Sequence, residues 1–213
     1  MNSSMIYNVQ RPKEVDPNKS YPALFLMHGI GSNEQNMLSL VEGLKQNFII
    51  FSIRGHLEQP PGFAYFTIEG YGKPHRPVFD EAVARLSDFI DYASSQYPID
   101  ESRLYLLGFS QGAILSMTLA LTLGSRIKGI VALNGYIPQF VKEEYSVQSV
   151  SQLSAFISHG EHDRVFPLEW GVANKEYLEN MGANVTFKVY PEGHTVSKAN
   201  YHDYVKWILE SID

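Results

Sequence analysis

Length, composition and charge exclude several classes of protein. The chain has 213 residues, of which 44% are hydrophobic and 19% charged, an ordinary globular composition that excludes a disordered or fibrous chain. Its 17 basic and 23 acidic residues give a formal net charge of −6, so the chain lacks the basic footprint of a protein that binds nucleic acid or anionic membranes. No cysteine is present, which excludes disulfides, cysteine-ligated zinc and a cysteine nucleophile.

The first ten residues have neither the basic start nor the apolar run of a signal peptide. No stretch contains the roughly 18 consecutive apolar residues that a membrane-spanning helix requires. We therefore expect a cytoplasmic protein without stable membrane anchoring.

Short apolar runs alternate with helix-length periodic stretches along the chain, which indicates a mostly parallel sheet with helices on both faces. With no internal repeat, low-complexity run or linker, we expect a single α/β domain over residues 1–213. The sequence predicts strands at 23–27, 48–53, 103–109, 128–133, 155–158 and 185–190. It predicts helices at 33–45, 78–96, 111–123, 168–180 and 197–209. A loop is expected at 54–77 and an irregular connection at 136–150.

A serine stands at the junction between one predicted strand and the helix that follows it. Residues 108–112 match the pattern G-x-S-x-G around Ser110, and the apolar runs on both sides predict a strand that turns sharply into a helix. Such a turn strains the serine backbone and holds Oγ above the carboxyl end of the sheet, beside a helix N-terminus that favours negative charge. The pattern predicts that Ser110 is a nucleophile; a serine that only caps a helix is the alternative.

A serine hydroxyl is a weak nucleophile until a neighbouring imidazole accepts its proton. Of the seven histidines, His194 is the best placed, because it lies between a predicted strand and the last predicted helix. Its loop is therefore expected at the carboxyl edge of the sheet, where Ser110 also lies. His202 lies within the last predicted helix and is the weaker candidate.

The acid that orients the base is expected in the loop after the strand at 155–158. This loop offers Glu161 and Asp163, and Asp163 is favoured because it lies deeper in the loop. Its carboxylate would accept the Nδ1–H of His194, fix the tautomer and stabilise the imidazolium.

The same loop permits a competing interpretation as a metal site. His159, His162 and Asp163 are residue types that bind zinc. Gly160 and the adjoining strand indicate a loop, however, so the two histidines would not share a helix face, and no further ligand stands at a recognisable spacing. We expect no metal and no cofactor.

A tetrahedral intermediate needs two N–H groups directed at its oxygen. One is expected from Gln111, the residue after the nucleophile, and the other from the glycine-rich loop after the strand at 23–27. We choose Ile30 as that second donor, with Gly29 as the alternative. A βα turn that only leads into a capped helix is the competing interpretation of this loop.

Taken together, these motifs resemble the α/β-hydrolase superfamily, and more narrowly its phospholipase/carboxylesterase family, which includes acyl-protein thioesterases and bacterial esterases. They occur in the expected order across residues 20–210. The resemblance implies an α/β-hydrolase fold with a minimal cap, a triad of Ser110, Asp163 and His194, oxyanion donors at Ile30 and Gln111, and no metal or coenzyme. The motifs that carry it are His28-Gly29-Ile30-Gly31, Gly108-Phe109-Ser110-Gln111-Gly112, Gly160-Glu161-His162-Asp163 and Gly193-His194.

Four aromatic residues in the 54–77 segment are expected to bind substrate, because apolar and aromatic side chains suit an acyl or aryl group. The alternative is that they pack beneath a long loop. Part of this segment, residues 58–66, departs from the family's pattern. The four residues are Phe63, Tyr65, Phe66 and Tyr71.

The leading hypothesis is a serine carboxylesterase that hydrolyses short-to-medium acyl esters through an acyl-enzyme intermediate. Its expected partner is a small-molecule ester and not a nucleic acid, and a homodimer is compatible with the sequence. A thioesterase, a lysophospholipase or a peptidase could use the same triad. A non-catalytic binding protein with this fold is the alternative from a different class.

Overall fold

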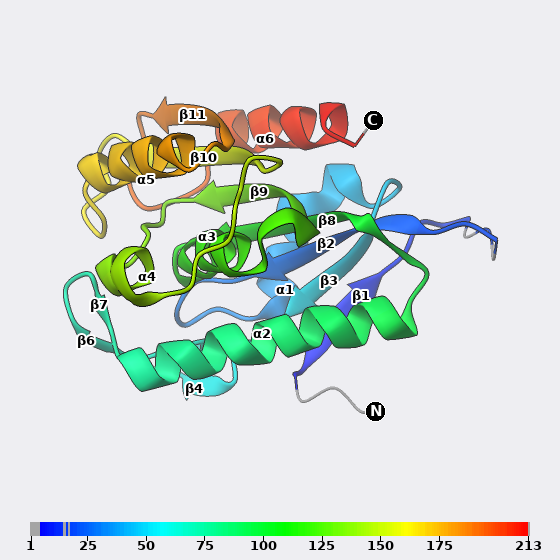
Figure 1. The fold of residues 1–213 in the computed structure, drawn as a ribbon, viewed down its shortest axis with the longest axis horizontal. Coiled ribbons are helices and arrows are strands. Elements are labelled where there is room, and N and C mark those ends of the chain that lie inside the picture. The colour runs from blue at the N-terminus through cyan, green and yellow to red at the C-terminus, as the bar shows by residue number, and fades with distance from the viewer. Residues whose placement is uncertain (1–4, 15, 17, 213) are drawn as a thin grey trace.

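A computed structural model describes residues 5–14, 16 and 18–212 (Figure 1). Seven strands form one sheet in the order β1-β3-β2-β8-β9-β10-β11. Within it β1 pairs antiparallel with β3, and every other neighbouring pair is parallel, which confirms the predicted mostly parallel sheet. The strands are β1 (Tyr7–Gln10), β2 (Tyr21–Met27), β3 (Ile49–Ile53), β8 (Ile99–Phe109), β9 (Ile127–Leu133), β10 (Ser154–Gly160) and β11 (Asn184–Tyr190).

Helices cover both faces of the sheet because buried strand residues alternate between two cores. Phe25 of β2 belongs to the core formed with α2 and α3, whereas its neighbour Leu24 belongs to the core formed with η1 and α6. In Figure 1, α2 runs along the bottom of the view and α6 along the top. The helical elements are α1 (Glu34–Met37), η1 (Leu38–Leu44), α2 (Arg76–Gln96), α3 (Gln111–Leu123), η2 (Gly124–Arg126), α4 (Gln139–Glu144), α5 (Leu168–Asn180) and α6 (Lys198–Glu210).

The expectation of one regular helix over 33–45 is wrong. The segment forms the single turn α1 and then the 3₁₀ helix η1. Side chains of α6 take part in its hydrogen bonding: the Tyr204 hydroxyl donates to the Leu40 carbonyl at 2.7 Å, and the Gly43 N–H donates to the Tyr201 hydroxyl at 2.9 Å. These long-range partners offer the backbone an alternative to a continuous α-helix.

The 54–77 segment contains two short hairpins and is not the irregular loop that its prolines suggest. β4 (Leu57–Gln59) pairs with β5 (Gly62–Ala64), and β6 (Ile68–Gly70) pairs with β7 (Lys73–Pro74). Phe63 of β5 also exchanges backbone hydrogen bonds with the loop after β2, because its N–H donates to the Ser32 carbonyl and its carbonyl accepts from the Gly31 N–H, both at 2.8 Å. The first hairpin therefore supports the loop predicted to bind the oxyanion.

The connection at 136–150 contains the short helix α4, which the sequence analysis did not predict. Asn174 of α5 holds the start of this connection by two hydrogen bonds. Its Oδ1 accepts from the Ile137 N–H and its Nδ2 donates to the Gly135 carbonyl, both at 2.9 Å. Among the described residues, no helix is both long enough and apolar enough to cross a membrane.

Candidate active site

The turn from β8 into α3 places Ser110 at the carboxyl edge of the sheet. Ser110 has φ 57° and ψ −116°, a left-handed conformation that costs energy for any residue with a Cβ. Gly108 and Gly112 make the turn possible, since a Cβ on Gly108 would overlap the Gly112 backbone, and one on Gly112 would overlap the Met27 carbonyl. The strained turn expected from the G-x-S-x-G pattern is present.

The loops after β10 and β11 bring two further polar side chains to this turn. His194 Nε2 lies 2.9 Å from Ser110 Oγ, and His194 Nδ1 lies 2.7 Å from Asp163 Oδ2. Because a carboxylate only accepts, Nδ1 carries the proton and Nε2 is free to accept from the serine hydroxyl. The structure therefore brings Ser110, His194 and Asp163 into one hydrogen-bonded chain, whereas the side chain of the alternative acid, Glu161, is exposed.

Asp163 is held by donors on both carboxylate oxygens. Its Oδ1 accepts from the backbone N–H groups of Val165 and Phe166 at 2.8 and 2.9 Å, and its Oδ2 accepts from Asn134 Nδ2 at 2.9 Å as well as from His194. Burial alone would raise the pKa of Asp163, but these hydrogen bonds outweigh it and hold the pKa below its usual value. The side chain is fully buried and ionised at neutral pH.

Asn134 is a site residue that the sequence analysis missed. It follows β9, is fully buried and, like Ser110, has a positive φ, here 53°. A polar residue that directly follows a buried strand, at the edge where Ser110 lies, was the available signal.

The histidines considered for a metal site are not arranged as ligands. The Nε2 of His159 donates to the Phe166 carbonyl at 2.9 Å, which fastens the loop that carries Asp163, and His162 is exposed. Among the described residues, no group of three His, Asp or Glu side chains is placed to hold a metal ion.

The loop after β2 lies against Ser110. A Cβ on Gly29 would be 3.2 Å from the Ser110 Cβ, so this backbone is within reach of an oxygen bound at Ser110. The Gly31 N–H already donates to Phe63, whereas within the described part of the chain no hydrogen bond is recorded from the N–H of Gly29 or Ile30. The side chain of Gln111 accepts from the Tyr65 N–H and donates to the Phe66 carbonyl, both just after the first hairpin. The backbone N–H of Gln111 lies at the start of α3.

The His28 ring stabilises the loop after β2 through two hydrogen bonds. Its Nδ1–H donates to the Gly29 carbonyl at 2.7 Å, and its Nε2 accepts from the Gly55 N–H at 2.9 Å. Complete burial lowers the pKa of His28, against the opposing effect of the hydrogen bond to Gly29. A neutral ring is also the only form that can accept from Gly55.

The four aromatic residues proposed for substrate binding occupy different environments. Tyr65 and Phe66 are fully buried, and the Tyr65 hydroxyl donates to the Ile53 carbonyl at 2.6 Å, so both support the core. Phe63 lies beneath the Arg54 guanidinium, 4.5 Å from its ring centroid. Tyr71 is 64% exposed and lines a pocket beside α4 and α5.

A second pocket, of about 270 Å³, lies between the β2 loop and the His194 loop. Ile30 and Phe109 lie on its wall together with Thr195 and Val196. Phe109 also contacts the His194 ring, with the centroids 5.0 Å apart. This recess is therefore directly beside His194.

This fold, with a nucleophile turn between a parallel strand and a helix, defines an α/β hydrolase. The Phospholipase/Carboxylesterase family description matches residues 12–212, and the chain belongs to that family. The solved carboxylesterase of Bacillus cereus has a similar structure, with a TM-score of 0.88 and 25% identity, covering 99% of this chain and 96% of that one.

Curated relatives extend the likeness to thioesterases. Acyl-protein thioesterase 1 of Neurospora crassa is 26% identical over 194 residues, which is 81% of this chain and 79% of the relative. Acyl-protein thioesterase 1 of Debaryomyces hansenii is 26% identical over 229 residues, 97% of each chain. The matches therefore extend along most of both proteins.

The close contact between Gly112 and Met27 predicts that a methyl group added at residue 112 strongly destabilises the fold. We expect Gly112→Ala to lower the free energy of unfolding by about 3 kcal/mol or more, because its Cβ would overlap a backbone carbonyl within a packed core. Gly70→Ala is the matched control: the nearest atom to its Cβ is Lys73 Cδ at 3.9 Å, so a change within about 0.5 kcal/mol is expected. Urea denaturation measures both, and equal stabilities for the two variants would contradict this account of the turn.

Buried His28 predicts a pH-dependent stability. Because its folded-state pKa is lowered, the unfolded chain binds the proton more readily once the pH falls below about 6.5. His28 therefore contributes stability at pH 8 that is lost on acidification. We expect His28→Gln to cost about 1–3 kcal/mol at pH 8 and less at pH 5, as measured by urea denaturation.

The exposed His202 supplies the control for this titration. His202→Gln removes a histidine without disturbing the loop after β2, and should leave the stability at pH 8 unchanged. A cost of His28→Gln that stays constant or grows toward pH 5 would show that the ring is not held neutral.

Proposed function

We propose that this protein is a serine hydrolase that cleaves carboxylic esters through an acyl-enzyme, with Ser110 as nucleophile, His194 as base and Asp163 as the orienting acid. The observation that carries the proposal is the continuous chain from Ser110 Oγ to His194 Nε2 at 2.9 Å and from His194 Nδ1 to Asp163 Oδ2 at 2.7 Å. In this arrangement one imidazole can accept from the serine hydroxyl while it donates to the carboxylate.

In this mechanism the serine hydroxyl transfers its proton to His194 Nε2 as Oγ attacks the ester carbonyl. The imidazolium formed is stabilised by Asp163, whose hydrogen bonds from Asn134 and the loop backbone keep it ionised. His194 then gives the proton to the leaving alcohol. Water repeats the sequence on the acyl-enzyme, releases the acid and restores the serine.

We assign the oxyanion donors to the backbone N–H groups of Ile30 and Gln111. Gly29 beside the Ser110 Cβ, and the position of Gln111 at the first turn of α3, support this assignment. The hydrogen bonds of His28 and of β5 to this loop would fix the donors before substrate arrives. Fixed donors of this kind lower the barrier because they need not reorganise as charge develops.

Oxygen esters of short-to-medium acyl chains are the substrates we favour. The carboxylesterase named among the similar structures supports an ester, and the thioesterases among the curated relatives favour a thioester as the second candidate. The pocket of about 270 Å³ beside Ile30 and Val196 is small, which supports a short acyl or alcohol group.

Loss of the nucleophile should abolish turnover without unfolding the protein. We expect Ser110→Ala to lower kcat by roughly 10⁴-fold or more, because the members of a triad act as a unit. Ser116→Ala is the control, because Ser116 is a buried serine of α3 whose hydroxyl donates to the Gly112 carbonyl. This variant should keep nearly full activity. Retention of a tenth of wild-type kcat by Ser110→Ala would require another nucleophile.

The substrate assignment predicts an order of rates on matched compounds. With one acyl group presented as an oxygen ester, a thioester and an anilide, we expect kcat/KM to be highest for the oxygen ester and lowest for the anilide. Within an oxygen-ester series, kcat/KM should fall as the acyl chain lengthens beyond medium size. A thioester hydrolysed faster than the matched oxygen ester would favour the thioesterase alternative.

A further inference from the structure

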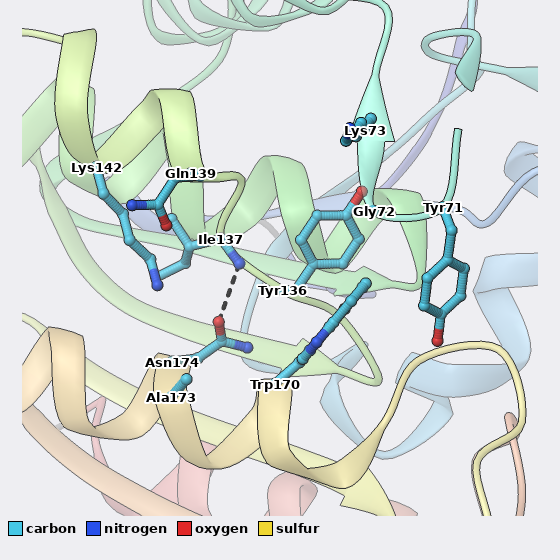
Figure 2. Close-up of a pocket in the computed structure, with 10 residues that line it drawn as sticks. All are labelled: Tyr71, Gly72, Lys73, Tyr136, Ile137, Gln139, Lys142, Trp170, Ala173 and Asn174. Carbon is cyan, nitrogen blue, oxygen red and sulfur yellow. Dashed lines mark hydrogen bonds between the residues drawn. The ribbon is translucent and has the colours of Figure 1, made fainter. Parts of the chain in front are cut away.

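One cavity outside the triad lies beside α4 and the start of α5. Its volume is about 380 Å³, which is within the range of small-molecule sites. Segments far apart in sequence form it: the β6–β7 turn, the connection after β9, α4 and α5, which gather at the left of Figure 1. Figure 2 shows aromatic rings at its centre and a lysine on either side.

The aromatic wall of this pocket extends toward the ring of His194. Trp170 contacts the rings of Tyr71 and Tyr136, with centroids 5.0 and 4.8 Å apart. Phe166 contacts Tyr136 and Trp170 on one side and His194 on another, at 5.0, 5.9 and 5.2 Å. One ring therefore separates the pocket wall from His194, so a substrate group in the pocket would lie near the reacting ester without taking part in the reaction.

The two lysines of the pocket lack an acidic partner. Lys142 and Lys73 both line it, and in the described chain neither forms an ion pair with a carboxylate. The Lys142 ammonium lies 5.0 Å from the Tyr177 ring centroid, a contact that positions the charge without neutralising it. Partial burial lowers the pKa of Lys142, as expected for a cation that no carboxylate compensates.

The acids of α4 have hydrogen-bond partners other than these lysines. Glu143 accepts from Gln139 Nε2, and Glu144 accepts from Arg76. The Tyr136 hydroxyl has no hydrogen-bond partner recorded among the described residues, and burial raises the pKa of Tyr136, so it remains a neutral donor. A ligand that supplies acceptor oxygens and negative charge would satisfy both kinds of group.

We propose that this pocket binds the non-reacting end of the substrate, and that this end carries a carboxylate on an apolar or aromatic group. The apolar part would pack on Trp170 and Tyr136, while the carboxylate would accept from Lys142 and, at the mouth, from Lys73. Because the whole chain carries a net charge of −6, its general field repels anions, and local cations are needed to select one. The inference rests on the proposed ester hydrolysis and specifies its substrate class.

The selectivity of the enzyme for charged esters tests the pocket. We compare 4-acetoxybenzoate with its methyl ester for a carboxylate on the alcohol side, and phenyl hydrogen glutarate with phenyl butyrate for one on the acyl side. In at least one pair the wild type should prefer the anion, and Lys142→Gln should lower the ratio of the two kcat/KM values by roughly tenfold. Lys142→Arg should retain most of the preference.

Lys206→Gln provides the charge-matched control, because Lys206 is exposed on α6 and removing it changes the net charge equally. It should leave both ratios at the wild-type value. If neither pair shows a preference that depends on Lys142, or if Lys206→Gln lowers the ratio as much, the pocket is not an anion subsite.

Binding without turnover separates this inference from the proposed function. In Ser110→Ala, 4-hydroxybenzoate should quench the fluorescence of Trp170, one of the two tryptophans in the chain, and 4-hydroxybenzamide should bind at least about tenfold more weakly. Trp170→Phe should remove the signal, and Lys142→Gln should weaken binding of the anion. If the acid binds more tightly than the amide but the wild type hydrolyses no ester, the proposed function is wrong and the anion site stands. If the wild type hydrolyses esters but acid and amide bind equally, the anion site alone is wrong.

Discussion

The site depends on how closely α3 approaches β2. Gly112 lies so near the Met27 carbonyl that no Cβ fits between them, and the chain enters α3 from β8 through the left-handed conformation of Ser110. That conformation raises the hydroxyl above the carboxyl edge of the sheet and exposes the first N–H groups of the helix beside it. The geometry required of a nucleophile therefore follows from a packing constraint between two buried elements.

Parallel strands bring the remaining groups to the same edge. The loop after β2 lies beside Ser110, and the loops after β9, β10 and β11 supply Asn134, Asp163 and His194. Each group is fixed by a partner from another loop: Asn134 donates to Asp163, and His28 joins the Gly29 carbonyl to the Gly55 N–H. Such cross-links keep the polar groups oriented before a substrate binds, which is how a rigid fold lowers a reaction barrier.

Much of this arrangement was predictable, because strong local patterns carry it. The G-x-S-x-G turn, the long amphipathic helix α2 and the placement of His194 between a strand and a helix are all short-range signals. The features missed depend on contacts distant in sequence. β1 has only four residues and is defined by pairing with β3. The 33–45 segment departs from an α-helix at Val41, which has φ −132°. Side chains of α6 form hydrogen bonds with the backbone on either side of Val41. Asn134 and His28 acquire their roles only when separate loops meet.

The proposed reaction requires that this hydrogen-bonded chain activates Ser110 as the nucleophile. The most direct measurement is treatment of the intact protein with a fluorophosphonate, followed by mass mapping of the peptides. We expect one phosphonyl adduct, on Ser110, formed at a rate that drops sharply when His194 is replaced by glutamine. An adduct on another residue, or no adduct on the folded protein, would contradict it.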